Sequence, residues 1–154
     1  MAVIRDPKSV AVRRGATYPS ELAEGFAGRI KRALGDFGGL TQFGVNLTTL
    51  EPGSASAHRH WHTREDEFVY VLEGEVTLVT DAGEEKLAPG MAAAFPAGEQ
   101  NAHQLVNRGN APATYLEIGT RSLDDDVVYT DVDLHIEKRA GRRAFVRKSG
   151  EPYE

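Results

Sequence analysis

Between residues 40 and 120 the chain alternates short apolar runs with glycine and proline punctuation. The runs are rich in valine, leucine, threonine, phenylalanine and tyrosine, the residue types that favour extended backbone. The pattern predicts strands over residues 41–50, 57–62, 67–72, 75–80, 84–87, 92–95, 102–107 and 113–119.

The gaps between these runs carry turn chemistry. They contain Gly74, Gly83, Gly90 and Gly98, together with prolines and asparagines that preset or tolerate tight turns. Many short strands at close, regular spacing are typical of an antiparallel sandwich or barrel. We therefore predict an all-β protein with one barrel over residues 40–120.

Two extensions flank the predicted barrel. In residues 1–39, Ser20 could cap a short helix, and residues 29–34 favour an edge strand with a charged face. Residues 121–154 carry an acidic run followed at once by a basic one, and we expect both to be solvated faces. This second extension is expected to pack on the barrel or on a partner subunit.

Length and charge narrow the function classes. The 154 residues suit one domain, and a formal net charge of −5 argues against a nucleic-acid surface. No stretch has the length of a signal peptide's apolar region or of a membrane span, so we expect a cytoplasmic protein without a membrane partner. Because cysteine is absent, any metal must bind to nitrogen and oxygen ligands.

Histidines and a glutamate supply such ligands. His58, His60 and His62 stand at alternate positions, and alternate side chains of a strand share one face. Glu67 opens the next predicted strand, and His103 follows about forty positions later. Strands distant in sequence lie side by side in a barrel, so His103 could complete a metal site.

These residues resemble the two motifs of the cupin superfamily. The first reads His60-Trp61-His62, four residues, Glu67, six residues, Gly74, and the second runs from Gly90 through residues 96–98 to His103 and Asn107. Two spacings differ from the family pattern. Six residues instead of five separate Gly53 from His60, and four residues instead of two separate Gly98 from His103. Both differences are changes of loop length that preserve the strand parities.

A second register of the first motif competes with this one. His58, His60 and Glu65 have the same spacing as His60, His62 and Glu67. The residue that follows Glu65 after a gap of six residues is Leu72, however, where the motif requires a glycine. The Glu67 register places Gly74 in a hairpin turn, where positive φ is needed. We therefore select His60 and His62, and expect His58 at the barrel mouth or on the surface.

The resemblance implies a small single-domain bacterial cupin of the conserved-barrel type, with a double-stranded antiparallel β-helix, or jelly roll. It implies one divalent metal ion, Mn, Fe, Zn, Ni or Co, on His60, His62, Glu67 and His103. Similarity to sugar-phosphate-isomerase-like cupins suggests a metalloenzyme acting on an oxygenated small molecule. A metal-dependent dioxygenase and a non-catalytic ligand-binding module are the alternatives.

Further residues are candidates for the chemistry. Glu117 is the best in-barrel base, with Tyr115 on the same strand face, although both could face outward while Leu116 and Ile118 fill the core. Aromatic residues could line a pocket, and cationic residues could bind a phosphate, although solvated surface charge is the more common role. These candidates are Trp61, Tyr70 and Phe95, and Arg29, Lys31, Arg32, Arg59 and Arg64. The two extensions exceed what one barrel requires, so we predict a homodimer.

Overall fold

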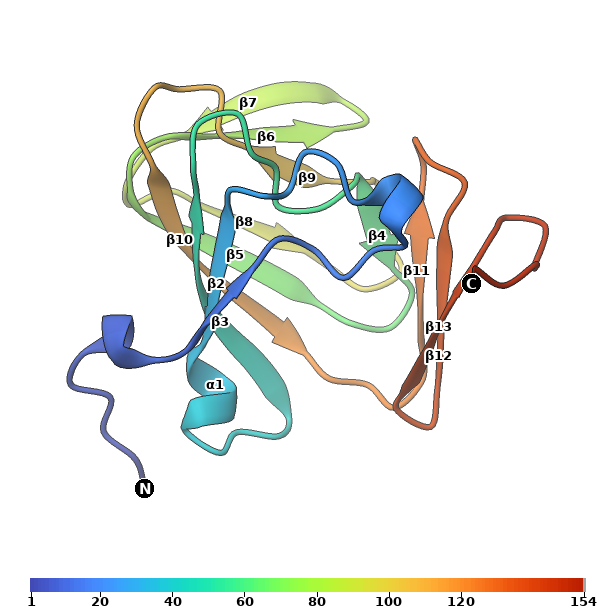
Figure 1. The fold of residues 1–154 in the computed structure, drawn as a ribbon, viewed down its shortest axis with the longest axis horizontal. Coiled ribbons are helices and arrows are strands. Elements are labelled where there is room, and N and C mark those ends of the chain that lie inside the picture. Colours follow the sequence, from blue (N-terminus) through green and yellow to red (C-terminus); the bar gives the residue numbers. More distant parts are fainter. Residues whose placement is uncertain (154) are drawn as a thin grey trace.

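Short antiparallel strands dominate the computed structural model, which describes residues 1–153 (Figure 1). A six-stranded sheet has the spatial order β1 (Val12–Arg14), β2 (Arg29–Ala33), β3 (Phe43–Leu50), β10 (Ala113–Thr120), β5 (Glu67–Glu73) and β8 (Ala92–Phe95). A three-stranded sheet has the order β7 (Gly83–Leu87), β6 (Val76–Thr80) and β9 (Gln104–Val106). A four-stranded sheet has the order β13 (Arg142–Val146), β12 (His135–Arg139), β11 (Asp125–Tyr129) and β4 (His60–His62).

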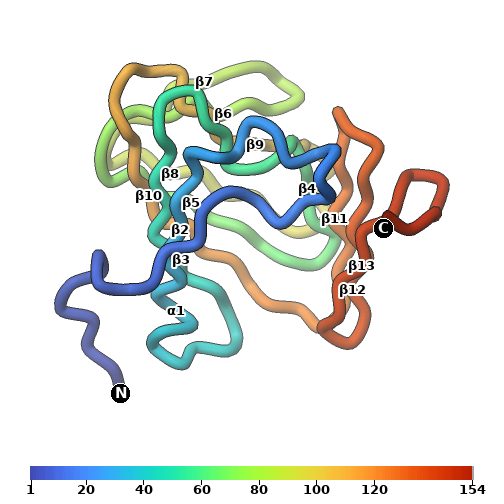
Figure 2. Tube along the Cα trace, viewed as in Figure 1, coloured from blue at the N-terminus to red at the C-terminus, as the bar shows by residue number. Residues whose placement is uncertain are grey.

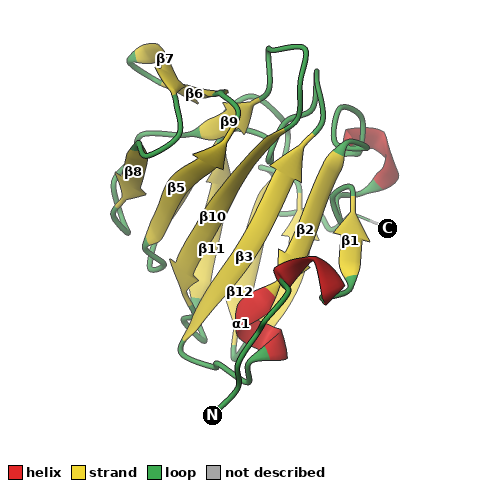
Figure 3. Ribbon diagram, turned by 90° about the vertical axis from the view of Figure 1, so that its left-hand side faces the viewer, coloured by secondary structure: helices red, strands yellow, loops and turns green. Residues whose placement is uncertain are grey.

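The two smaller sheets form the second layer of a jelly roll. An isolated antiparallel bridge between His60 and His103 joins the first residue of β4 to the residue before β9. In Figure 3 the six-stranded sheet faces the viewer, with β11 and β12 behind it. The predicted all-β antiparallel jelly roll is confirmed.

The main core lies between the layers, where alternate side chains of the strands point inward. In β10, Ala113 and Tyr115 are buried, and in β5, Val69 and Val71 are buried on the same side. They pack with side chains of the second layer in one cluster. Each fully buried valine or leucine contributes roughly 1.5–3 kcal/mol by its removal from water. The turn after β5 needs Gly74, whose φ is 72° and whose added Cβ would lie 2.6 Å from the Pro112 carbonyl oxygen.

Short helices are confined to the N-terminal segment. They are η1 (Pro7–Ser9), η2 (Ser20–Leu22) and α1 (Leu34–Phe37), of which the first two are 3-10 helices. Figure 2 traces the N-terminal segment across the molecule to the C-terminal strands. There Tyr18 and Leu22 pack against a second core cluster, which contains Val127, Tyr129 and Leu134. None of the helices within residues 1–153 has the length and apolarity to span a bilayer.

Several expectations about the extensions were wrong. The strand at 29–34 is not an edge strand, because β1 pairs along its outer side. The charged residues after 120 form three paired strands, β11 to β13, and Asp125 at the start of β11 is only 2% exposed. Many positions of these strands hold charged residues, which form cross-strand ion pairs such as Arg139 with Asp126. The strands therefore lack the apolar pattern by which the other strands were predicted. Residue 154, the last of the predicted extension, lies outside the described residues.

Candidate metal centre

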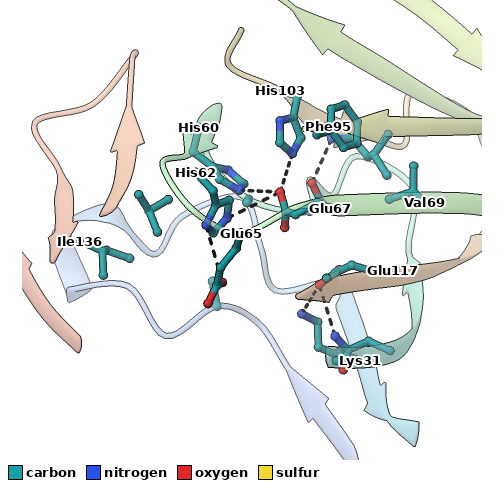
Figure 4. Close-up of a pocket in the computed structure, with 18 of the residues that line it drawn as sticks. Lys31, His60, His62, Glu65, Glu67, Val69, Phe95, His103, Glu117 and Ile136 are labelled. Atoms are coloured by element: carbon teal, nitrogen blue, oxygen red, sulfur yellow. Dashed lines mark hydrogen bonds and ion pairs between the residues drawn. The ribbon is translucent and has the colours of Figure 1, made fainter. Parts of the chain in front are cut away.

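Three imidazoles converge on one carboxylate oxygen between the two layers (Figure 4). The Nε2 atom of His103 lies 2.8 Å from Oε2 of Glu67, and the Nε2 atoms of His60 and His62 each lie 3.6 Å from the same oxygen. β4 supplies the two alternate histidines, the first residue of β5 supplies the glutamate, and the residue before β9 supplies His103. The structure thus brings together the four residues of the predicted ligand set.

Hydrogen bonds to the far side of two rings fix their tautomers. The Nδ1 atom of His60 lies 2.8 Å from the His58 carbonyl oxygen, and Nδ1 of His62 lies 2.6 Å from Oδ2 of Asp125. Because these oxygens only accept, both Nδ1 atoms donate, and a neutral ring then directs its Nε2 lone pair toward Glu67. The Nε2 lone pairs of His60 and His62 face the negatively charged Oε2 of Glu67 at 3.6 Å. These atoms repel one another unless a cation or a proton lies between them. The donor set therefore fits a divalent metal with nitrogen and oxygen ligands.

The charges around the cluster also favour a cation. Burial opposes charge at Glu67, but the hydrogen bond from His103 and the nearby imidazoles of His60 and His62 hold the pKa of this carboxyl well below its usual value. Burial would lower the pKa of His62, yet Asp125 and the neighbouring glutamates raise it above its ordinary value. The pKa of His103 is lowered by burial in spite of its contact with Glu67. A negative site that raises the pKa of one histidine also attracts a metal ion.

Two buried carboxylates behind His62 were missed by the sequence reasoning. Asp125 accepts hydrogen bonds from His62, from the Thr63 hydroxyl at 3.2 Å and from the Arg64 amide at 2.8 Å. Glu65, only 7% exposed, pairs with Lys138 at 2.6 Å.

Asp125 holds the Nδ1 side of His62, opposite the candidate metal, and Glu65 lies 3.8 Å from the same nitrogen. Asp125 was assigned to a solvated acidic run, and Glu65 appeared only in the rejected register. The signal that could have found Asp125 is its alternation with the apolar Val127 and Tyr129 on one strand face.

We expect Asp125→Asn to weaken divalent-metal binding by roughly 10- to 100-fold, as loss of an outer hydrogen-bond partner of a ligating histidine commonly does. The amide keeps the shape of the carboxylate but lacks its charge and can present an N–H to His62. The dissociation constant from chelator competition measures the effect. Asp126→Asn, which removes the neighbouring carboxylate from the opposite strand face, should leave the constant unchanged. Equal affinities in the two variants would contradict the positioning role of Asp125.

A cavity of about 290 Å³ opens beside the cluster and reaches the inner face of the six-stranded sheet. His60, His62, Glu67 and His103 line one side of it. Arg29, Lys31, Tyr115 and Glu117 line it from β2 and β10. Of the alternatives for Tyr115 and Glu117, the structure adopts the inward one.

Glu117 lies close to the cluster and carries its own ion pair. It is two residues from Gly119, which pairs directly with Glu67 across β10 and β5, so the two carboxyl-bearing residues are diagonal neighbours, about 7–8 Å apart. Oε1 of Glu117 accepts from Lys31 Nζ at 2.8 Å and from Asn46 Nδ2 at 3.4 Å. Burial raises the pKa of Glu117, but the charges of Lys31 and Arg29 outweigh it and lower the pKa below its usual value. The carboxylate is ionised at neutral pH and can accept a proton.

Tyr115 presents a buried hydroxyl. The residue is 1% exposed, and burial raises the pKa of its hydroxyl far above the ordinary value, so the group stays protonated. Its oxygen has no hydrogen-bond partner among residues 1–153, although Ser56 lies close by without completing a bond. Tyr115 can therefore donate to a small molecule in the cavity.

The other candidates divide between the cavity and the surface. Phe95 stacks on His103 with ring centroids 3.6 Å apart and lines the main cavity, whereas Trp61 lines a smaller cavity of about 160 Å³ on the other side of the cluster. Tyr70 points outward and is 39% exposed. Of the five cationic candidates, two line the main cavity, Arg29 and Lys31, and three do not, Arg32, Arg59 and Arg64.

His58 has a structural position that the sequence did not indicate. It was expected at the barrel mouth or on the surface, yet it is half-buried and its ring packs against Tyr18 and Phe26. Its Nε2 lies 2.9 Å from the Leu22 carbonyl oxygen, so this nitrogen fastens the N-terminal segment to the barrel. It lies outside the group of ligand atoms formed by His60, His62 and Glu67, which are all within 4.8 Å of one another.

Comparison with known proteins identifies relatives of this fold and site. The sequence model of the Cupin domain matches residues 46–119. The crystal structure of a sugar phosphate isomerase of the cupin superfamily from Silicibacter pomeroyi is 49% identical, with 97% of this chain and 95% of that chain covered and a TM-score of 0.92. No curated protein matches the chain.

Two further solved structures are more distant. A protein of Acidithiobacillus ferrooxidans, provisionally described as a sugar phosphate isomerase, is 32% identical over 82% of this chain and 80% of its own, with a TM-score of 0.74. The polyketide cyclase RemF of Streptomyces resistomycificus is 25% identical over 78% of this chain and 80% of its own, with a TM-score of 0.64. The fold, the motif residues and these relatives agree, and the chain belongs to the cupin superfamily.

Proposed function

We propose that this cupin is a metal-dependent isomerase of an oxygenated small molecule, and that a sugar or a sugar phosphate is its substrate. One divalent ion would bind to His60, His62, Glu67 and His103. The observation that carries the proposal is the placement of an ionised carboxylate, Glu117, diagonally across from Glu67 in the same cavity. The Silicibacter pomeroyi relative, described as a sugar phosphate isomerase, supports this substrate class.

The residues of the cavity can divide the work of such a reaction. A bound divalent ion supplies Lewis acidity toward substrate oxygens. Glu117 accepts the proton from the hydroxyl-bearing carbon beside the carbonyl and returns it to the former carbonyl carbon, while the hydroxyl proton passes to the former carbonyl oxygen, so that no external oxidant or reductant is needed. Lys31 and Asn46 hold Glu117 at its Oε1 atom, and Tyr115 donates its hydroxyl hydrogen to a substrate oxygen.

Exchange with deuterated solvent tests this proposal directly. Protein stripped with a chelator is reloaded separately with Mn²⁺, Zn²⁺ or Fe²⁺ and mixed with sugars, sugar phosphates and keto acids in D₂O. We expect metal-dependent appearance of deuterium at the carbon beside the carbonyl, followed by NMR. Oxygen consumption without exchange would favour a dioxygenase instead, and binding without either reaction would favour a ligand-binding module.

We also propose that the chain forms a homodimer through the outer face of the six-stranded sheet. Both extensions pair within the chain, through β1–β2 and β11–β4, so they supply no free strand for exchange. The outer face of β5 instead exposes Phe68, Tyr70 and Leu72, each between 38% and 40% exposed. Adjacent exposed apolar residues of this kind favour association with a second copy.

Light scattering at micromolar concentration should give twice the mass of one chain. The double variant Phe68→Lys/Leu72→Lys should give a folded monomer, because four lysines would meet across a two-fold interface. Leu123→Lys removes an apolar residue that is 72% exposed and lies after the six-stranded sheet, and it should leave the dimer intact. A monomeric mass for the unmodified protein would refute the homodimer.

A further inference from the structure

One wall of the cavity combines positive charge with unpaired hydrogen-bond donors. Arg29 and Lys31 are two residues apart on β2 and share the face that lines the cavity. Lys31 pairs in register with Thr48 of β3, which pairs in turn with Tyr115 of β10. These side chains form one continuous polar stretch across three neighbouring strands.

Arg29 forms no direct ion pair with a carboxylate among residues 1–153. Two other cations of the cavity have acidic partners, since Lys31 pairs with Glu117 and Arg121 pairs with Asp36. Within residues 1–153 no carboxylate oxygen lies within 4.0 Å of the Arg29 guanidinium. Arg29 is also partly buried, so solvent screens its charge only in part.

The geometry of the guanidinium leaves one edge available. Nη1 donates to the Gly15 carbonyl oxygen at 2.9 Å, which anchors the group from the N-terminal segment. The Nε atom is buried and has no hydrogen-bond partner among the described residues. The Nε–Nη2 edge of arginine is the edge that binds the two oxygens of a phosphate or carboxylate side by side.

Unpaired buried donors gather on this wall. Residues 1–153 contain four buried side-chain polar atoms without a partner, and three belong to the polar stretch: Arg29 Nε, Thr48 Oγ1 and Tyr115 Oη. Native proteins leave few buried polar groups unpaired, and such groups often mark the position of a ligand or an ion. Their concentration beside an arginine that has no ion-pair partner among the described residues indicates an anionic ligand.

We propose that Arg29 binds an oxyanionic group of the substrate, a phosphate or a carboxylate, on the wall of the cavity that β2 supplies. The site deepens the proposed function and rests on it for the identity of the reaction. It selects substrates that carry the anion at one end and the reacting carbonyl at the other. Arg29 determines which molecules enter in this orientation, while Glu117 acts on the reacting carbons.

Binding of inorganic phosphate and of acetate to metal-free protein tests the site without any reaction. Both probes are titrated by calorimetry into chelator-treated protein, so that an ion cannot hold them. We expect Arg29→Gln to weaken phosphate or acetate binding about tenfold or more, since it removes a charge-assisted two-point contact. Stronger binding of phosphate would identify a phosphate ester, and stronger binding of acetate a sugar acid.

Arg32→Gln is the matched control. It removes the same charge from the same strand, but Arg32 lies on the opposite face and donates to the Lys8 carbonyl oxygen. We expect this variant to bind the probes as the unmodified protein does. Equal loss in both variants, loss in neither, or no binding of either probe to the unmodified protein would overturn the proposal.

Two further measurements keep the test decisive. If Arg29→Gln does not fold, Arg29→Lys retains the charge without the two-donor edge, and unchanged probe affinity in that variant would refute the contact. Metal content and deuterium exchange are measured on the same samples. Arg29-dependent phosphate binding without exchange would leave the anion site in place and refute the isomerase, whereas exchange without Arg29-dependent binding would do the reverse.

Discussion

Replacing His103 with alanine should give a folded protein that no longer retains a divalent metal. His103 is the histidine in closest contact with Glu67, at 2.8 Å, and it reaches the site from the strand layer opposite β5. Loss of a ligating imidazole should exceed the roughly 10- to 100-fold loss of affinity caused by removing an outer partner. Elemental analysis of untagged protein and chelator competition measure the change, which we expect to be from about one ion per chain to almost none.

His58→Ala is the matched control for this experiment. It removes an imidazole from the same stretch of chain, but one that contacts Leu22 and Tyr18 and lies outside the cluster. We expect it to lower the melting temperature and leave the metal content unchanged. Full metal retention in His103→Ala, or equal metal loss in both variants, would refute the proposed ligand set.

Replacing Glu117 with glutamine should reduce turnover by about 10²- to 10⁴-fold, the usual contribution of a positioned general base. The amide keeps the volume and the contact with Asn46 but cannot accept a proton from carbon. Metal content should not change, because Glu117 lies outside the ligand set. The rate of deuterium incorporation into substrate measures the effect separately from product formation.

Stability must be controlled in this variant, because Lys31 loses its ion-pair partner. A part-buried charge left without its hydrogen-bond partner costs about 1–3 kcal/mol of the free energy of unfolding. The double variant Glu117→Gln/Lys31→Met removes that unpaired charge and should recover stability without recovering turnover.

Glu75→Gln alters a surface glutamate that is also paired with a lysine, Lys86 at 3.0 Å, and should retain full activity. Turnover at the unmodified rate in Glu117→Gln would exclude this residue as the base.

Two layers of hydrogen bonds give the site its rigidity. His62 is held by Asp125, which is itself held by Thr63 and the amide of Arg64, and Glu65 is held by Lys138. Of these partners, Asp125 belongs to β11 and Lys138 to β12, and both strands lie outside the segment matched by the Cupin domain model. The C-terminal strands therefore contribute to the geometry of the candidate metal centre as well as to the second core cluster.

The N-terminal segment contributes to the wall of the same cavity. Gly15 anchors the guanidinium of Arg29, and Tyr18 lines the cavity and packs on Tyr129. Residues from both extensions thus shape the space around the residues of the two barrel motifs.

The sequence by itself determined the barrel strands, and its resemblance to the cupin motifs indicated four candidate ligands. Apolar runs between turn residues located β3, β5, β6, β8 and β10 with only small errors at their ends, because these residue types favour extended backbone and the glycines and prolines end each strand. The spacing of His60, His62 and Glu67 to Gly74 was enough to select their register, since Gly74 has the positive φ that the turn requires. Strand positions and turn geometry depend on residues close together in sequence, so a sequence pattern can predict them.

Only the tertiary structure decided the surroundings of that group. Asp125 and Arg29 belong to charged stretches that look solvated in sequence, and their burial depends on pairing with strands far away in the chain. β11 pairs with β4 across more than sixty positions, and that pairing brings Asp125 to His62. The residues that neighbour a charged residue in sequence do not indicate its ion-pair or hydrogen-bond partner, because that contact forms only when distant strands pair.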